Sequence, residues 1–408
     1  MSNDNVTLAS RCSGAIAHLA RGGSAYAHVK GPALNLRASA AQTLHRRQDV
    51  SVFNASTQPV DALTSGGYSD IVLRHSAIIN SISLKVTLEH PTGVSLVPRD
   101  LFFMFDHVDV LASGSTVIER IEPEHLWLAF TRLSASEQAA IIWGLSGGQT
   151  ADSTSEFNST TSNSFYIPLL HSVLSDHHVA VGFTTSEPIT LRCYFRGPSW
   201  TGPDNVLAAQ PTIASFQAVV RGYEDAHEQE LKRRRYLTGN VPMHIRFARP
   251  SAQRTVESMS SGKTTVRLSS VQGMVTSMTV LMRAVGATKS LDAIYTVDIL
   301  QNGSSIWGQP LDAVYLQSDE AAHEGQNASA FNAGGGIDYR ALSLPVGSAG
   351  ARKGEARGAL LGYRVFDGSS FELVVTGPVI ATDVEIVVLF RSVAVMEINR
   401  GRISIHQS

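Results

Sequence analysis

Cysteine and charge are both scarce in this sequence. Cys12 and Cys193 are the only cysteines among 408 residues, which excludes a disulfide framework and favours a reducing compartment. Charged residues make up 17% of the chain, below the roughly 25% of an average domain. The formal net charge of -2 argues against a protein that is basic along its whole length, such as a dedicated nucleic-acid binder.

Long hydrophobic segments are missing as well. No run approaches the roughly 18 apolar residues that cross a bilayer. The stretch after "MSNDNVTLASRC" is rich in Ala and Gly and is interrupted by Arg and His, unlike a signal peptide. The sequence therefore predicts no transmembrane helix, and we expect a soluble chain that is made inside the cell.

From residue 50 onward the sequence consists of short apolar runs bounded by Gly, Pro, Ser or Asp. In "SDIVLRHSAIINSISLKVTLEH", Ile82, Leu84 and Val86 alternate with other residues, which is the period of a strand with one buried face. "LFFMFDHVDVL", "SFYIPLLHSVL" and "ITLRCYFRG" are further runs of this kind. Short strands at regular spacing are typical of a β-sandwich or barrel.

One segment with the pattern of a strand and a turn occurs twice in the sequence. "VDVLASGSTVI" at residues 108–118 recurs as "VDILQNGSSIW" at residues 297–307, a constant offset of 189. The repeated residues are Val108, Asp109, Gly114 and Ser115 in the first copy and Val297, Asp298, Gly303 and Ser304 in the second. We expect both glycines to need positive φ, because Ser-Gly and Asn-Gly turns connect hairpins in that conformation.

Further matches occur in the same order. "DIVLRHSAIINSISLKVTL" is answered by "TTVRLSSVQGMVTSMTVLM", where Ile79 and Leu84 correspond to Val275 and Val280 at an offset of 196. "IDYRALSLPV" stands where "SFYIPLLHSV" stood, and "VEIVVLFRS" answers "ITLRCYFRG" at an offset of 195. The alternative is that unrelated strands and turns have come to use similar residues. The common order of the matches favours one β-domain used twice.

These patterns divide the chain into four parts. Residues 1–48 form a basic arm, residues 49–215 the first β-domain, residues 216–242 a helical linker and residues 243–408 the second β-domain. The arm holds six basic residues against Asp4 alone, a charge of +5. Its basic residues are Arg11, Arg21, Lys30, Arg37, Arg46 and Arg47. A disordered tail remains an alternative to an arm with one or two helical turns.

Catalytic motifs are not found. Gly262-Lys263-Thr264 imitates the end of a phosphate-binding loop, but Glu257 stands where that loop requires glycine. His177 and His178 are adjacent, so on a strand they would point to opposite faces and not share a metal. No HExxH or GxSxG motif occurs. We therefore predict no catalytic, cofactor-binding or metal-binding residues and no small-molecule substrate, and we favour a structural protein.

The first copy resembles a known family. In "FFMFDHVDVLASGSTVIERIEPEHLWLAF", a strand and a Gly-containing turn lead to an Ile-Glu-Arg triplet and a Trp-containing helix. The residues that carry this likeness are Val108, Asp109, Gly114, Ile118, Glu119, Arg120 and Trp127, followed by the short apolar segment Tyr166, Ile167, Pro168 and Leu169. This order is similar to the first jelly roll of double jelly-roll major capsid proteins of icosahedral double-stranded DNA viruses. The Phe-Trp-Phe run that usually follows the proline is absent.

The resemblance implies an all-β fold of two tandem jelly-roll sandwiches, each of eight strands, with short helices and long inter-strand loops. It implies homotrimers that act as pseudo-hexameric capsomers, with neighbouring capsomers and minor capsid or penton proteins as partners. The loops at 146–164 and 319–337 would be outward towers or trimer contacts, and the basic arm would face an internal membrane or the genome. The protein would be made in the host cytoplasm and located in the virion.

Two other classes of protein stay open at this stage. One is a tandem β-sandwich that binds carbohydrate or serves as a fibre or attachment protein. The other is a bicupin-like enzyme, which needs metal-ligating His and Glu in at least one copy. The first copy offers His75, His90, His107, His125 and His171, whereas the repeated blocks of the second offer only His323.

Overall fold

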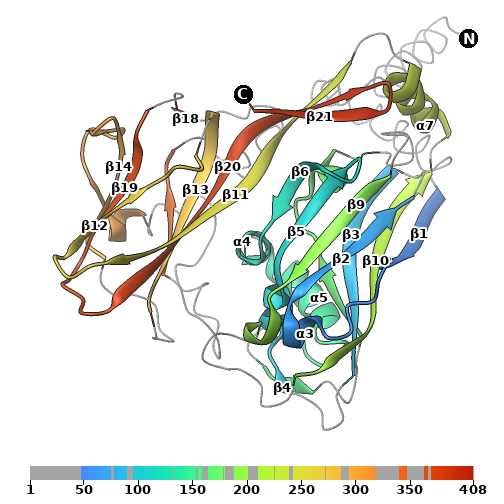
Figure 1. Ribbon diagram of the computed structural model, residues 1–408, viewed down its shortest axis with the longest axis horizontal. Coiled ribbons are helices and arrows are strands. Elements are labelled where there is room, and N and C mark those ends of the chain that lie inside the picture. Colours follow the sequence, from blue (N-terminus) through green and yellow to red (C-terminus); the bar gives the residue numbers. More distant parts are fainter. Residues whose placement is uncertain are drawn as a thin grey trace, which may run out of the picture.

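The computed structural model shows two β-sandwiches joined side by side (Figure 1). The residues it describes are 47–74, 78–89, 95–131, 133–152, 155–158, 164–177, 179, 188–200, 210–224, 226–238, 242–271, 273–285, 294–316, 318, 340–346, 363–365 and 369–407.

The first sandwich has two four-stranded antiparallel sheets. One sheet has the order β1 (Arg47–Asn54), β10 (Thr212–Glu224), β3 (Ile78–Glu89) and β8 (Ser164–Pro168). The other has the order β2 (Gly67–Leu73), β9 (Ile189–Phe195), β5 (Phe105–Ala112) and β6 (Thr116–Ile121). A small separate pair joins β4 (Ser95–Leu96) to β7 (Phe157–Asn158).

The second sandwich repeats this arrangement strand for strand. Its first sheet has the order β11 (Met243–Ser258), β20 (Asp383–Asn399), β13 (Gly273–Ala284) and β17 (Arg340–Leu344). Its second has the order β12 (Lys263–Arg267), β19 (Phe371–Thr376), β14 (Thr296–Gln301) and β15 (Ser304–Ser305). Three further strands pair at the margins: β16 (Leu311–Asp312), β18 (Tyr363–Val365) and β21 (Arg402–Gln407).

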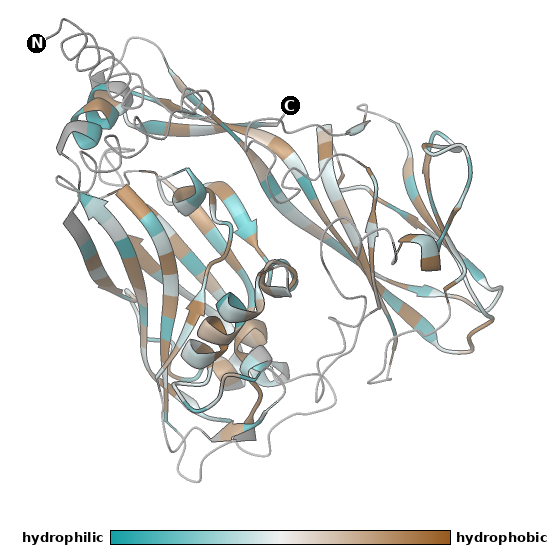
Figure 2. Ribbon diagram, turned by 180° about the vertical axis from the view of Figure 1, so that it is seen from behind, coloured by the Kyte–Doolittle hydropathy of each residue, from teal (hydrophilic) through white to brown (hydrophobic). Residues whose placement is uncertain are grey.

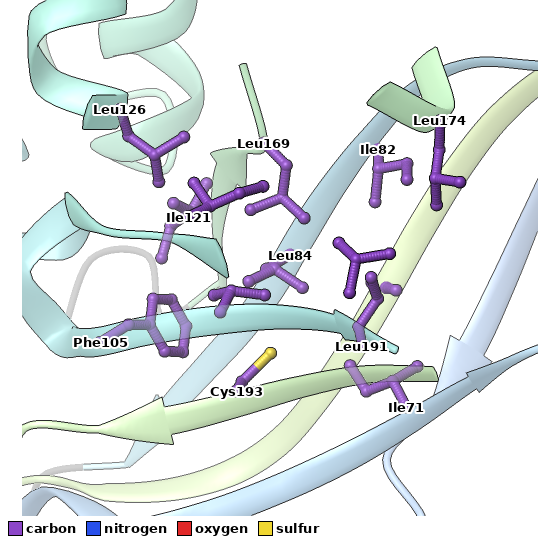
Figure 3. Close-up of a cluster of buried hydrophobic side chains, with 14 of the residues drawn as sticks. Ile71, Ile82, Leu84, Phe105, Ile121, Leu126, Leu169, Leu174, Leu191 and Cys193 are labelled. Carbon is purple, nitrogen blue, oxygen red and sulfur yellow. The ribbon is translucent and has the colours of Figure 1, made fainter. Parts of the chain in front are cut away.

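Both halves therefore follow the jelly-roll strand order, and the predicted fold of two tandem eight-stranded jelly rolls is confirmed. Alternation of burial along the strands explains the packing. In β3, Ile82, Leu84 and Val86 are buried, and the residues between them are only partly buried. Figure 3 shows Ile82 and Leu84 pointing toward Leu191 and Cys193 of the facing sheet. Cys193 is a free cysteine buried in this core.

Helices are short and lie mainly in the first jelly roll. Among the described residues, those of the first jelly roll are α3 (Ala62–Ser65), α4 (Pro123–Thr131), α5 (Ala135–Leu145), α6 (Val173–Asp176) and the 3-10 turns η2 (Pro98–Met104) and η4 (Gly197–Ser199). The start of α5 is capped because the backbone N–H of Ser134 donates to the Glu137 carboxylate (2.9 Å). None of the helices that the structure describes combines the length and the apolar character needed to span a membrane.

The linker between the jelly rolls is shorter than the sequence predicts. Residues 216–224 belong to β10 and only residues 226–238 are helical, as α7 (Ala226–Arg233) and the π turn η5 (Arg234–Thr238). The Val and Ala side chains of "FQAVVRG" alternate between the core and the outer face, so the segment pairs as a strand. At the other end, β1 begins at Arg47, within the segment assigned to the basic arm.

One of the sequence matches is wrong. "ITLRCYF" is β9, in the middle of one sheet, whereas "VEIVVLFRS" lies in β20, in the middle of the other. The counterpart of β9 is β19, and the counterpart of β20 is β10. The shared Phe-Arg pair led to the wrong match, because β9 and β20 are both central, buried strands with a similar apolar composition. The matches of β3 with β13, β5 with β14 and β8 with β17 are consistent with the observed strand order.

The repeated turn has the same backbone in both copies. Ser113 and Gly114 have φ values of 53° and 71°, and Asn302 and Gly303 have φ values of 52° and 79°. Positive φ at both central residues is the pattern of a type I′ hairpin turn, whose twist matches the flanking strands. Both glycines thus adopt the conformation that the sequence predicts for them.

Replacing Gly114 or Gly303 with valine should lower stability by about 1–2 kcal/mol, because a branched L-residue is strained at positive φ. A Cβ at either position would meet no atom within 4 Å, so the strain lies in the backbone alone. The expected result is a lower thermal unfolding midpoint for each valine variant. Asparagine at the same positions is the control, since it tolerates this conformation, and equal midpoints for Val and Asn would contradict the account.

Candidate functional site at the joint between the jelly rolls

The outer face of the β11-β20-β13-β17 sheet is buried against the first jelly roll, and we call this contact the joint. Along β20, Val387 and Leu389 belong to the hydrophobic core of the first jelly roll. The alternate residues Ile386, Val388 and Phe390 belong to the core of the second. Strand β20 is therefore buried on both faces, which explains its continuous apolar sequence.

Residues from β11, β13, β20 and β21 complete the apolar part of the joint. They are Ile245, Phe247, Leu281, Ala394, Met396, Ile398 and Ile403, all buried in the core of the first jelly roll. Figure 1 shows β6 and α4 on the side of the first jelly roll that faces these strands. In Figure 2, apolar bands run along the strands on either side of this contact. One hydrophobic core thus spans both jelly rolls and limits their relative movement.

An arginine joins the two halves through charge. Arg254 of β11 donates from Nη2 to Oε1 of Glu124 at 2.6 Å, and Glu124 is 1% exposed at the start of α4. The same nitrogen lies 3.7 Å from Oε2 of Glu122, and Nη1 lies 3.9 Å from Oε1 of Glu385. Arg283 holds Glu385 in turn. This chain of ion pairs fixes the start of α4 above β11 and β20.

The two carboxylates of the first jelly roll respond differently to this environment. Burial would raise the pKa of Glu124, but the positive charges of Arg254 and Arg196 outweigh it and hold the pKa below its usual value. For Glu122, burial and the neighbouring Glu124 raise the pKa to about 7, although Arg254 opposes the shift. The joint therefore contains one carboxylate that stays ionised and one that titrates near neutral pH.

The Ile-Glu-Arg triplet is structural at every position. Ile118 lies in the core. Glu119 is buried and accepts hydrogen bonds from the Ser172 hydroxyl and from the Val173 N–H (3.1 Å), which holds the segment that begins α6. Burial raises the pKa of Glu119 to about 7. Val117, just before the triplet, accepts from Nη2 of Arg249 at 3.2 Å, so β6 also carries part of the joint.

The repeated aspartates stabilise the repeated hairpins by different contacts. Asp109 accepts two hydrogen bonds from Arg120 of the neighbouring strand, at 2.7 Å from Nε and 2.9 Å from Nη2. Asp298, its counterpart, accepts from the Ser305 hydroxyl at 2.7 Å. Both carboxylates are buried and partnered, so neither is free for chemistry. Val108 and Val297 lie in the two cores, and Ser115 and Ser304 follow the turns.

The tryptophan of the motif holds α4 in place. Trp127 stacks on Phe130 with centroids 4.9 Å apart and meets Phe102 of η2 edge-on at 6.0 Å. These contacts fix the helix whose first turn carries Glu124. The motif is thus a support for the joint.

The residues predicted for the basic arm are mostly not described. Arg11, Arg21, Lys30, Arg37 and Arg46 lie outside the described residues. Arg47 opens β1, where its backbone pairs with Glu224 at the end of β10. The arm therefore joins the first jelly roll beside the start of α7.

The histidines considered for a metal site are dispersed. His107 stacks on Tyr194 at 4.2 Å, His125 is buried in α4, and His171 lies 3.6 Å from Asp176. His75, His90 and His323 fall outside the described residues. Within the described ranges, no three His, Cys, Asp or Glu side chains come together as metal ligands.

Sequence reasoning missed the joint. Arg254 and Glu124 are 130 residues apart, and neither belongs to a repeated motif. The available signal is the apolar run "VEIVVLF", because an ordinary sandwich strand alternates and this one does not. That run indicates that another part of the protein packs on each face of β20. It does not indicate which part of the protein packs on the outer face.

Comparisons with known proteins agree with this architecture. No protein-family model and no curated protein matches the sequence. Solved structures do match the fold. A chain of the PBCV-1 virus capsid aligns with a TM-score of 0.62 at 10% identity, covering 89% of this chain and 97% of that chain. The Faustovirus major capsid protein aligns with a TM-score of 0.58 at 8% identity, covering 87% of this chain and 91% of that chain. The mavirus major capsid protein aligns with a TM-score of 0.52 at 9% identity, covering 88% of this chain and 90% of that chain. The shared property at this identity is the fold, two jelly rolls in one chain.

Replacing Arg254 with methionine should cost about 1–3 kcal/mol, because the buried Glu124 would lose its hydrogen-bond donor and keep the more distant Arg196, whose Nη2 lies 3.6 Å away. The measurement is chemical denaturation followed by tryptophan fluorescence. Adding Glu124→Gln to the same chain should recover part of the loss, since the buried and incompletely compensated charge is then removed. Arg233→Met is the matched control: its partner Glu230 lies on an exposed helix face, and no measurable change is expected. Equal losses for Arg254→Met and Arg233→Met would refute a special role for the joint.

Stability should fall as pH rises from about 5 to about 7.5, and Glu122→Gln should reduce this fall. The folded-state pKa of Glu122, about 7, lies above its ordinary value of 4.5. The protonated form is therefore favoured by folding, a contribution of up to about 3 kcal/mol that is complete below pH 4.5 and lost toward pH 7. Denaturation midpoints across this range measure it.

Glu230→Gln serves as the control for that pH series. Hydrogen bonds from Arg233 and Arg234 hold the pKa of Glu230 below its usual value, so it stays ionised throughout the range. Its variant should keep the wild-type slope. A Glu122→Gln variant with the wild-type slope would contradict the assignment.

Proposed function

We propose that the chain is a major capsid protein whose homotrimers are the pseudo-hexameric capsomers of an icosahedral virion. The observation that carries the proposal is the presence of two jelly rolls with the same strand order, joined where strands of the second enter the hydrophobic core of the first. The fold of the Faustovirus and mavirus major capsid proteins supports it, since it aligns over nearly the whole chain.

The geometry gives the proposal its physical basis. Two similar units in one chain, repeated by a three-fold axis, place six similar wedges around a ring. A closed ring with six similar sides fits the six-coordinated positions of an icosahedral lattice. In this function the protein works by packing and shape, without catalysis.

The partners follow from the same proposal. They are two further copies within the capsomer, neighbouring capsomers in the lattice, and minor capsid or penton proteins at its edges. The arm at residues 1–48, with a charge of +5, would contact an internal membrane or the genome, because both present phosphates. The place of action is the virion, after synthesis in the host cytoplasm.

The mass of the purified protein in solution tests the proposal. Light scattering after size exclusion should give about 131 kDa, three chains of 43.8 kDa each. A mass of one or two chains over the micromolar range would count against a trimeric capsomer. The measurement needs no assembly partner.

A further inference from the structure

The joint brings together two different surfaces of the jelly roll. The second jelly roll contributes the outer face of its β11-β20-β13-β17 sheet, which we call the sheet face. The first jelly roll contributes the end of β6 and the start of α4, which we call the helix edge. Because the fold is duplicated, each jelly roll has both surfaces, and the joint uses one of each. Within the described part of the chain, α5 approaches the sheet face of the first jelly roll at β8, whereas Val50 and Val52 of β1 and the helix edge of the second jelly roll remain exposed.

Residue equivalences can be followed through the ladders. The offset of 196 residues places Ser83 of β3 at the position of Thr279 of β13. Ser83 pairs with Val219, and Thr279 pairs with Leu389. Val219 of the first jelly roll therefore takes the position of Leu389, a residue at the centre of the joint.

The same ladders extend to the edge strands. In β1, Val52 pairs with Val219, and in β11, Ala252 pairs with Leu389. Val52 thus corresponds to Ala252, and two residues further on Asn54 corresponds to Arg254. The arginine that binds the helix edge in the joint is replaced by a neutral side chain on the unused sheet face.

The unused sheet face exposes apolar side chains. Val50 and Val52 are 58% and 55% exposed, although they lie in the middle of a strand. Their strand, β1, is at the edge of its sheet and pairs only with β10 among the described strands. An exposed apolar edge strand favours association with another surface.

The unused helix edge is apolar as well. A helical turn at 313–316 follows β15 and β16, as α4 follows β6. It exposes Val314 (67%) and Tyr315 (54%), and the adjoining Tyr295 is 56% exposed. The Ala313 N–H donates to the Tyr295 carbonyl (3.0 Å), and the N–H groups of Val314 and Tyr315 donate to Asp312 Oδ1 (2.7 Å and 3.2 Å), which fixes the backbone of the turn.

The Arg254–Glu124 pair of the joint has no charged counterpart on the two unused surfaces. At an offset of 189, Ala313 stands where Glu124 stands in the first jelly roll, and Tyr295 stands where Asp106 stands. Glu124 and Asp106 of the used helix edge thus have uncharged counterparts here, just as Arg254 of the used sheet face has in β1. The charges that remain beside these apolar side chains are opposite in sign: Arg221 pairs with Val50 on the sheet face, and Asp312 precedes the turn on the helix edge.

We infer that these surfaces bind each other between copies of this chain. The 313–316 turn and Tyr295 of one copy pack on Val50, Val52 and Val219 of the next copy, in the geometry that the joint already uses within the chain. The contact is head-to-tail, so it repeats around a ring. The inference rests on the proposed function for the number of copies, but it names the surface through which they associate.

Single lysine substitutions test the contact. Val52→Lys and Val314→Lys each place a charge on one of the two surfaces, at positions where the folded monomer leaves room. Each should reduce the mass from about 131 kDa to 43.8 kDa at the concentration where the wild type is trimeric. Tyr68→Lys is the matched control, because Tyr68 is equally exposed (58%) but lies on β2, in the other sheet. Circular dichroism and the thermal midpoint confirm that each variant is folded.

A charge pair makes the test independent of any single variant. A chain with both Val52→Lys and Val314→Glu should recover the trimeric mass, because the new charges meet across the contact. A trimeric wild type whose Val52→Lys and Val314→Lys variants remain trimeric would overturn this inference and leave the proposed function intact. Dissociation by Tyr68→Lys to the same extent would also overturn it. A wild type that is not trimeric would defeat the proposed function itself.

Discussion

Strand β20 supplies side chains to two hydrophobic cores, because alternate residues of a strand point to opposite faces. Ile386, Val388 and Phe390 fill the second jelly roll, and Val387 and Leu389 fill the first. Each fully buried aliphatic side chain of this kind contributes roughly 1.5–3 kcal/mol. The two sandwiches are therefore a single packed body at this strand, and the direction of one fixes the direction of the other. A tile built from two units per chain depends on that constraint.

Charge adds specificity to a contact that apolar packing stabilises. A buried ion pair often adds little stability compared with a pair of apolar residues at the same place. A buried charge that has lost its partner, however, lowers the stability by several kcal/mol. Arg254 on one surface and Glu124 on the other therefore select each other over the equivalent surfaces of the chain, which have Asn54 and Ala313 at these positions. The sheet face of β1, with Asn54 in place of Arg254, offers Glu124 no partner. In this interpretation the joint and the contact between copies use the same geometry without competing.

Much of the fold could be predicted from local signals, and most of the joint could not. The alternation in β3, the repeated Gly turns and the Trp-containing helix all depend on residues close in sequence, and the structure contains each of them. The match of β9 to β20 failed because central strands of different sheets share composition, so Phe195-Arg196 and Phe390-Arg391 look alike. The Arg254–Glu124 pair joins segments 130 residues apart and leaves no periodic signal. Only the unbroken apolar run of β20 shows in the sequence that a second partner exists.

The account is tested most directly by averaged electron-microscope images of the purified oligomer, viewed along its symmetry axis. The account predicts six lobes around a three-fold axis, alternating between two kinds, because each chain places two rigidly joined jelly rolls side by side. Three well-separated lobes, a two-fold outline or lobes that vary in spacing from particle to particle would contradict it, since each would mean that the two jelly rolls of a chain do not act as equal, fixed sides of one tile.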